Sequence, residues 1–412
     1  MRASNHSHKN WKPWVRIALA TALLFGGVLS AARDSVAPEP PIVVGYFPAW
    51  GIHKRFFVKN LISEGAMRML DQINYSQGHI KDNECTIADA NADLDYLFSP
   101  EDSVNGTADF AEMPLKGNFH QLQELKRLYP QVKIVISLEG NPDSFAEAAQ
   151  PGNVFAFVAS CVQTFIEGKF ADGVEVPGLF DGIDIDWEYP RDVDKYNFLA
   201  LLAEFRRQLD AARPGLLLSV AMGDFGASYQ HLDMETVALY VDQVGVMNYD
   251  YSGPWSERTG LVAPLYSSPG DPEKSSDVDH TIRGYEKAGV PDSKILMGLP
   301  FYAYSWSNVW PANHGLFQLG RPSHTDIPYS YISSIRSEFT EYRDPDSLAP
   351  WLFDGLTFWT YDDEISIGAK LEYAKDQGLG GVMIWELSGD TSDGKLLRTI
   401  SEQFRNQKRA TP

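Results

Sequence analysis

The stretch that decides the fold reads Phe180-Asp181-Gly182-Ile183-Asp184-Ile185-Asp186-Trp187-Glu188-Tyr189-Pro190. Three of its acids, Asp184, Asp186 and Glu188, alternate with two isoleucines and a tryptophan. Because successive side chains of a β-strand point to opposite faces, the acids share one face and the apolar residues share the other. The lead-in residues are also apolar. The pattern therefore predicts a buried strand that carries a row of acids, and it excludes a solvated edge strand.

The row of acids suits acid–base catalysis. Neighbouring acids on one face of a strand lie ~7 Å apart, and like charges at that distance raise each other's pKa. At least one carboxyl then holds a proton near neutral pH, as a general acid must. The glycine-bearing loop of calcium sites is missing, so we expect no metal ion and no cofactor. Asp181 falls outside the alternation, and we expect it to make a structural hydrogen bond.

Asp-x-x-Asp-x-Asp-x-Glu followed by Tyr-Pro resembles the signature of glycoside hydrolase family 18, the chitinases. Other segments resemble the same family, and the resemblance spans roughly residues 41–400. These segments are Val44-Gly45-Tyr46-Phe47, Gly117-Asn118-Phe119, Gly253-Pro254-Trp255, Ala263-Pro264-Leu265, Gly298-Leu299-Pro300-Phe301-Tyr302 and Tyr361-Asp362-Asp363.

The resemblance implies a retaining, substrate-assisted glycosidase. The acids cluster on one strand, so a carboxylate nucleophile facing Glu188 is not evident, and in this family the acetamido oxygen of the substrate attacks instead. Glu188 would protonate the leaving oxygen and later activate water. Asp186 would hold the acetamido N–H, Asp184 would share a proton or a hydrogen bond with Asp186, and Tyr249 would donate to the acetamido oxygen. Substrate-binding residues are expected to be Asp250, Trp385, Trp50, Trp255, Met247 and Tyr46.

Apolar segments with the lengths of strands recur along the chain, at 42–47, 71–76, 132–137, 180–188, 216–222, 241–249, 295–302 and 381–387. Helical spacing lies between several of them, at 119–128, 145–170, 198–209, 282–289 and 366–378. Eight strands alternating with helices predict an α/β fold, the (β/α)8 TIM barrel, at residues 41–407. In such a barrel Glu188, Tyr249 and Trp385 fall at the catalytic rim, where strands end.

Two intervals are unusually long. Nearly eighty residues separate the seventh and eighth strands, and they predict a small α+β insertion at 307–363, which forms one wall of the cleft in similar chitinases. A polar stretch at about 81–115 predicts a long, functional loop. We expect no separate carbohydrate-binding module after residue 403.

Residues 1–32 have the plan of a secretory signal peptide. Four Lys and Arg precede or enter an apolar run at 17–29, and small residues follow, so we expect cleavage after Ala32 and a linker at 33–40. The run is short for a membrane span, and a retained anchor is the alternative. The expected location is extracellular or periplasmic. Cys85 and Cys161 would then either form a disulfide or remain two buried thiols.

The net charge of −20 becomes −24 when the leader, with four basic and no acidic residues, is removed. An acidic protein of this kind argues against nucleic acid or an anionic membrane as partner. It is compatible with a neutral polymer such as chitin, and we expect a monomer that acts on N-acetylglucosamine oligosaccharides. Alternatives are an endo-β-N-acetylglucosaminidase for glycans or peptidoglycan, and a non-catalytic chitin-binding lectin, which Glu188 disfavours.

Three positions depart from the family pattern. Glu139 stands where a Ser-x-Gly-Gly motif is usual and puts a carboxylate near the site. Gln77 replaces an aromatic residue, and Tyr304 replaces an arginine after Phe301-Tyr302. The catalytic groups are intact, so these departures concern the preference for substrate.

Overall fold

The computed structural model describes residues 40–405 except 172, 225–228 and 275. The expected signal peptide and most of the linker lie outside the described residues. No helix within the described residues is long and apolar enough to cross a membrane.

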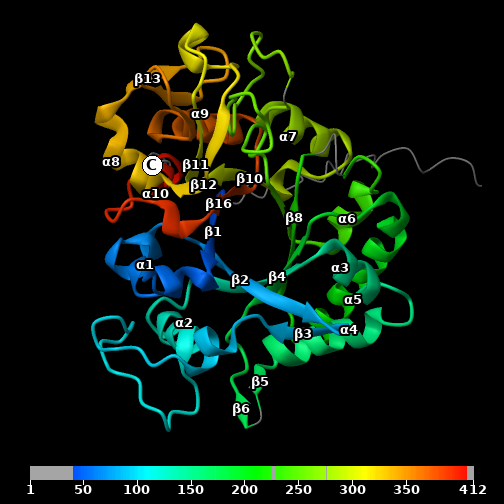
Figure 1. Ribbon diagram of the computed structural model, residues 1–412. Coiled ribbons are helices and arrows are strands. Elements are labelled where there is room, and N and C mark those ends of the chain that lie inside the picture. The colour runs from blue at the N-terminus through cyan, green and yellow to red at the C-terminus, as the bar shows by residue number, and fades with distance from the viewer. Residues whose placement is uncertain (1–39, 172, 225–228, 275, 406–412) are drawn as a thin grey trace, which may run out of the picture. The chain divides into compact units, whose positions relative to one another are not determined.

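Eight parallel strands form a closed barrel (Figure 1). The barrel closes because β1 pairs with both β2 and β16, for example Gly45 with Ile73 and with Ile384. This confirms the fold class. In chain order the strands are β1 (Ile42–Pro48), β2 (Gln72–Lys81), β4 (Lys133–Gly140), β7 (Gly182–Trp187), β8 (Leu217–Met222), β9 (Gln243–Val246), β10 (Ile295–Pro300) and β16 (Gly381–Trp385).

Helices follow the strands and cover the barrel with apolar faces. On α5, for example, Phe198, Leu202, Phe205 and Leu209 are buried, which is the stripe that the sequence predicts. The helices of this layer are α2 (Gly117–Leu128), α3 (Pro142–Ala148), α4 (Val154–Cys161), α5 (Lys195–Ala212), α6 (Met234–Tyr240), α7 (Val278–Lys287), α9 (Glu364–Asp376) and α10 (Lys395–Arg405).

Several element boundaries differ from the sequence prediction. The helix expected at 145–170 is interrupted between α3 and α4, because Pro151 and Gly152 form a turn there. The sixth strand ends at Val246, so Tyr249 lies in the loop that follows β9. The second strand continues to Lys81 and pairs with an antiparallel strand, β3 (Glu84–Ile87). Part of the expected long loop is therefore a hairpin.

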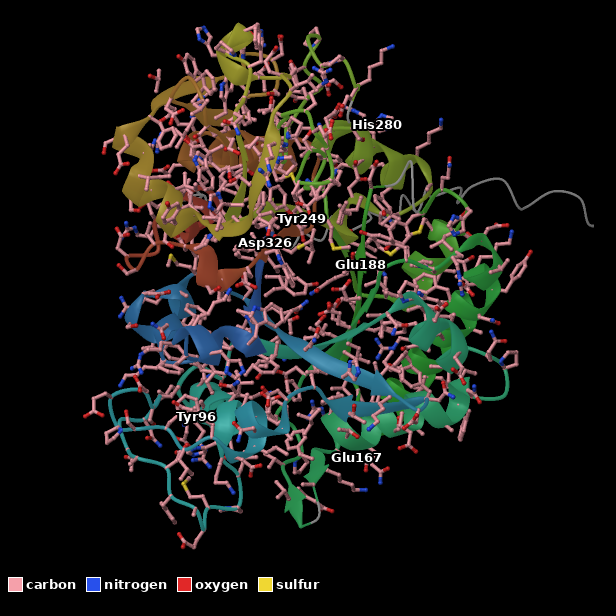
Figure 2. The ribbon with its side chains drawn as sticks, viewed as in Figure 1. Tyr96, Glu167, Glu188, Tyr249, His280 and Asp326 are labelled. Carbon is pink, nitrogen blue, oxygen red and sulfur yellow. A yellow bond between two sulfur atoms is a disulfide. The ribbon has the colours of Figure 1, made fainter. Side chains whose placement is uncertain are left out.

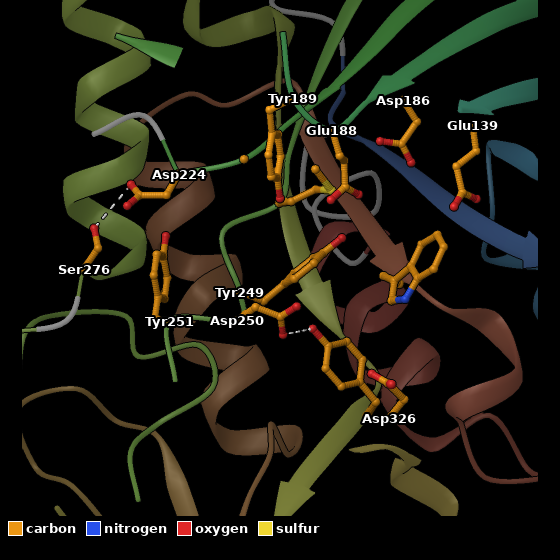
Figure 3. Close-up of a pocket in the computed structure, with 14 residues that line it drawn as sticks. Glu139, Asp186, Glu188, Tyr189, Asp224, Tyr249, Asp250, Tyr251, Ser276 and Asp326 are labelled. Carbon is orange, nitrogen blue, oxygen red and sulfur yellow. Dashed lines mark hydrogen bonds between the residues drawn. The ribbon is translucent and has the colours of Figure 1, made fainter. Parts of the chain in front are cut away.

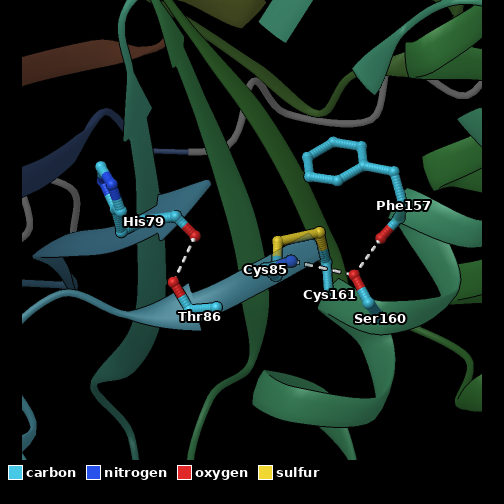
Figure 4. Close-up of a disulfide and its surroundings, with 6 residues drawn as sticks. All are labelled: His79, Cys85, Thr86, Phe157, Ser160 and Cys161. Atoms are coloured by element: carbon cyan, nitrogen blue, oxygen red, sulfur yellow. Dashed lines mark hydrogen bonds between the residues drawn. A yellow bond between two sulfur atoms is a disulfide. The ribbon is translucent and has the colours of Figure 1, made fainter. Parts of the chain in front are cut away.

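A disulfide joins this hairpin to the helical layer (Figure 4). Cys85 lies on β3 and Cys161 ends α4. The backbone N–H of Cys85 also donates to Ser160 Oγ at 2.9 Å. Of the two possibilities left open by the sequence, the structure therefore has the disulfide.

A five-stranded antiparallel sheet lies between β10 and α9 in the chain. Its strand order is β12-β11-β15-β14-β13, and it carries one helix, α8 (Tyr329–Ile335). The strands come from residues 302–360 and overlap the segment 307–363 expected as an insertion. They are β11 (Tyr302–Ser307), β12 (Arg321–Pro328), β13 (Thr340–Arg343), β14 (Pro350–Phe353) and β15 (Phe358–Thr360).

Candidate active site

A cavity of about 380 Å³ opens among the residues that follow the barrel strands (Figure 3). Figure 2 shows Glu188 and Tyr249 together with Asp326 in the middle of the molecule, whereas Tyr96 and Glu167 lie far from them. The lining residues are Glu139, Asp186, Glu188, Tyr189, Gly223, Asp224, Met247, Tyr249, Asp250, Tyr251, Ser276, Tyr302, Asp326 and Trp385. Because Tyr302 and Asp326 come from the five-stranded sheet, that sheet supplies one wall.

Glu188 directly follows the last residue of β7 and is exposed toward the cavity. The preceding Trp187 is buried and stacks on Phe145 with ring centroids 5.3 Å apart, which fixes the end of the strand. The cavity walls remove water from the Glu188 carboxyl and raise its pKa, while a hydrogen bond with Tyr189 lowers it. Glu188 therefore keeps a proton at a higher pH than a free glutamate does, which suits a general acid.

Asp184 and Asp186 have different surroundings. Asp184 is buried and accepts hydrogen bonds from Tyr46 (2.8 Å), Ser137 (2.8 Å) and Ser219 (2.5 Å). Within the described part of the chain it makes no hydrogen bond to Asp186, so a direct bond between the two, as the sequence allowed, is not present. Asp186 Oδ1 is buried without a partner among the described residues. Burial, then the charges of nearby acids, raise the pKa of Asp186 well above its usual value.

The hydroxyl of Tyr249 makes a single weak contact within the described residues. Its oxygen lies 4.0 Å from Met383 Sδ, in a buried position. Burial, followed by the charge of Asp250, raises the pKa of Tyr249, so the phenol stays protonated and can donate. Tyr249 can therefore turn its hydrogen toward a ligand in the cavity.

Asp250 adopts a left-handed backbone conformation, with φ of 62°. Its Oδ1 accepts hydrogen bonds from Tyr302 at 2.5 Å and from Tyr304 at 3.0 Å. Burial of the carboxylate raises the pKa of Asp250, and the two hydrogen bonds lower it. Burial is the larger effect, and the resulting pKa is about 6. Tyr304, which departs from the family pattern, thus holds Asp250 in place.

Trp385 is half-buried at the end of β16, and its ring lies 5.5 Å from the ring of Tyr46 and 6.1 Å from that of Trp50. A second cavity of about 630 Å³ shares Trp385, Tyr302 and Asp326 with the first. The two cavities therefore adjoin across these residues. An aromatic floor that continues from one cavity into the next suits a chain of sugar rings.

The structure brings most of the predicted residues together. Asp186, Glu188, Met247, Tyr249, Asp250 and Trp385 line the first cavity, and Trp50 lines the second. Three others do not line either cavity. Asp184 and Tyr46 are buried and bonded to each other, so both act as support. Trp255 is 62% exposed and packs edge-on against Tyr304, outside the lining. Asp181 makes the expected structural contacts, with Lys126 and with the N–H of Ile134.

The sequence analysis missed several lining residues, chiefly Asp224, Tyr251 and Asp326. Asp224 follows β8, so its position after a barrel strand was a usable signal. Asp326 lies on β12, in the five-stranded sheet, and only the tertiary fold brings it to the cavity. The acids of the site thus come from several elements, although the sequence draws attention to those of one strand.

The chain resembles known enzymes over most of its length. The model of the family "Glycosyl hydrolases family 18" matches residues 42–390. Chitinase 63 of Streptomyces plicatus is 31% identical over 92% of this chain, and Chitinase C of Streptomyces lividans is 31% identical over 87%. The chain spans 63% and 58% of the length of these two relatives.

Solved structures show the same likeness. The catalytic domain of the psychrophilic chitinase B from Arthrobacter TAD20 has a TM-score of 0.83 and 31% identity, and the match covers 89% of this chain and 96% of that domain. A family 18 N-acetylglucosaminidase from Paenibacillus barengoltzii has a TM-score of 0.71 and 29% identity, with 88% and 99% covered. With the barrel, the acid-bearing strand β7 and the cavity at its end, these matches show that the chain belongs to glycoside hydrolase family 18.

Proposed function

We propose that the protein cleaves β-1,4 linkages between N-acetylglucosamine residues of chitin or its oligosaccharides, with retention of configuration. The observation that carries the proposal is the pair Asp186 and Glu188 at the end of β7, where both side chains line one cavity floored by Trp385. The related chitinases support chitin as the substrate.

In the first step Glu188 donates its proton to the glycosidic oxygen, and the bond from that oxygen to the anomeric carbon breaks. The acetamido oxygen of the same sugar forms a bond to the anomeric carbon, which gives an oxazolinium ion. Asp186 accepts the acetamido N–H and stabilises the positive charge, a role that fits its unpartnered Oδ1. Tyr249 donates to the acetamido oxygen.

In the second step Glu188, now ionised, takes a proton from water. The resulting hydroxide attacks the anomeric carbon, the oxazolinium ring opens, and the product keeps the β configuration. Burial and then the charge of Glu188 raise the pKa of Asp186, and burial raises the pKa of Glu188, so both carboxyls hold their protons to a higher pH than free acids do.

Three other functions fit less well. A lectin needs no acid with a raised pKa in its cavity, whereas Glu188 has one. Peptidoglycan carries acidic lactyl groups or acidic peptides on its alternate sugars, and the first cavity is lined by acids, which repel such a substrate. An endo-β-N-acetylglucosaminidase for neutral glycans is the remaining alternative, and the adjoining cavities favour a linear chain over it.

The test replaces the acid: Glu188→Gln keeps the shape of the side chain and removes its proton chemistry. We expect kcat on N-acetylglucosamine oligomers to fall by at least about 10³-fold, with oligomer binding retained by calorimetry and an unchanged circular dichroism spectrum. Wild-type turnover in this variant would sink the proposal.

The same assay checks the source of the nucleophile. Fully deacetylated oligomers lack the acetamido oxygen and should not be cleaved, and proton NMR of fresh product should show the β-anomer. Cleavage of those oligomers would point instead to a carboxylate nucleophile, and an α-anomer would exclude retention.

We further propose that the protein is exported and acts as a monomer. The leader pattern at 1–32 and the disulfide between Cys85 and Cys161 support export, because disulfides persist in oxidising compartments. The strongly negative charge supports a monomer, since like-charged copies repel each other.

A further inference from the structure

The lining of the first cavity is unusually one-sided in charge. Among the described residues that form it, six are carboxylic acids and none is a lysine, arginine or histidine. The proposed mechanism uses Asp186, Glu188 and Asp250. Chitin is neutral, so its cleavage gives no reason for the other acids, which are Glu139, Asp224 and Asp326.

Glu139 is the most informative of these three acids. It lies on β4, directly opposite Asp186 in the β4–β7 register, and Figure 3 shows the two side chains next to each other at the cavity. Glu139 is half-buried, and no hydrogen bond or ion pair to its carboxylate is present in the described part of the chain. Asp224, by contrast, accepts a hydrogen bond from Thr281 at 3.0 Å.

A half-buried carboxylate without a partner is unfavourable unless a ligand brings one. Burial and the charge of Glu188 raise the pKa of Glu139, which reflects this cost. The adjacent Asp186 is only 5% exposed and lines the same cavity. Its Oδ1 atom also has no hydrogen-bond partner among the described residues. The neutral acetamide can satisfy Asp186, but it offers no positive charge for Glu139.

The arrangement of side chains argues against a metal ion as the partner of Glu139. In the described residues, no group of three or more His, Cys, Asp or Glu side chains is arranged so that it could hold one. A sugar hydroxyl can donate to a carboxylate, but the protonated amine of a deacetylated sugar residue pairs with it more strongly, because both groups are then charged. A polymer of such residues is also attracted to a chain with a net charge of −20.

We propose that Glu139 makes the cleft prefer partly deacetylated chitin, by pairing with the protonated amine of a glucosamine residue that lies beside the N-acetylglucosamine at the catalytic centre. The proposal rests on the proposed function. The central sugar keeps its acetyl group because that group supplies the nucleophile. Asp326, at the junction of the two cavities, adds negative charge on the side of the five-stranded sheet.

The experiment compares wild-type protein with Glu139→Gln on two hexasaccharides, one fully acetylated and one with a single glucosamine next to the cleaved bond. We expect wild-type kcat/KM to be higher on the glucosamine-containing chain. The ratio of the two kcat/KM values should fall about tenfold in Glu139→Gln, which corresponds to the loss of one ion pair of ~1.4 kcal/mol. The matched control is Glu372→Gln, an exposed acid on α9, which should leave the ratio unchanged.

A second measurement needs no variant. High salt screens an interaction between charges, so the preference of the wild-type protein should weaken as sodium chloride is added. An equal ratio in wild type and Glu139→Gln, or a ratio that ignores salt, overturns the proposal. If the wild-type protein cleaves neither hexasaccharide, the proposed function is wrong. If it cleaves both with equal kcat/KM, only the preference inferred here is wrong.

Discussion

Asp184 and Asp186 stand two positions apart on the same strand, yet their surroundings give them opposite tasks. Asp184 accepts hydrogen bonds from the hydroxyls of Tyr46, Ser137 and Ser219, so its carboxyl group is fixed in place. Asp186 keeps a bare oxygen toward the cavity. The alternation in the sequence could place both on one face, but it could not show which of them would be satisfied, because the three donors come from other strands.

Tyr249→Phe tests the donor to the acetamido oxygen. Among the described residues its hydroxyl contacts only Met383 Sδ, at 4.0 Å, so its removal costs the fold little. We expect kcat on N-acetylglucosamine oligomers to fall about 10²-fold, as for the loss of one transition-state donor, with little change in KM. Tyr196→Phe is the control, because Tyr196 is 75% exposed on α5 and lines neither cavity. Similar losses in both variants would contradict this role.

The raised pKa of buried Asp93 makes the stability of the fold depend on pH. Asp93 accepts from Tyr75 and Asn118, and burial raises its pKa to about 7. The folded pKa exceeds the unfolded value of about 3.9, so the contribution of Asp93 to stability is complete below that value and is lost as pH rises to about 7. At 1.4 kcal/mol per pKa unit the loss is on the order of 4 kcal/mol.

Asp93→Asn keeps an acceptor for Tyr75 and removes the titration. We therefore expect the decline in Tm between pH 4 and pH 8, followed by calorimetry, to be smaller in this variant than in wild type. Asp89→Asn serves as a control, because the N–H of Ala92 lowers the pKa of Asp89 and its loss should not flatten the decline. An equal decline in Asp93→Asn and wild type would count against the argument.

At the scale of elements, the hairpin formed by β2 and β3 depends on one covalent link. The disulfide between Cys85 and Cys161 spans 76 residues, and in the chain-entropy account a loop of that size contributes about 4.5 kcal/mol. We expect dithiothreitol to lower the Tm of the wild-type protein. The double variant Cys85→Ala, Cys161→Ala should have a lower Tm than the oxidised wild-type protein, and dithiothreitol should not change it. If oxidised wild type, reduced wild type and the double variant all have the same Tm, the disulfide adds no stability.

The elements also show how far sequence patterns reach. The barrel strands were predictable, because parallel strands inside a closed sheet are buried on both faces and therefore carry continuous apolar runs. The β2–β3 hairpin was not, since residues 77–87 are largely polar and gain their order from the disulfide and from pairing. The break between α3 and α4 had a signal, the Pro151-Gly152 pair, which the strong helical spacing on either side outweighed.

At the scale of the whole molecule, the leader pattern at residues 1–32 predicts export and cleavage of the chain. If residues 1–32 direct export, expression of the full chain in a secreting bacterial host should release a protein whose N-terminal sequence begins at Arg33. The physical reason is the basic start, the short apolar run and the small residues at 30–32. Edman sequencing of the protein outside the cytoplasm checks this, and deletion of residues 2–32 should keep the protein inside. An intact N-terminus on membrane-bound protein would favour the anchor.

The way in which the barrel closes has a consequence for how the chain is made. β1 pairs with β2 on one side and with β16 on the other, so one edge of β1 stays open until residues 381–385 leave the ribosome. Until then the nascent chain cannot complete its sheet. If the chain is exported as we propose, this late completion would let it pass through a narrow translocation channel before the barrel closes.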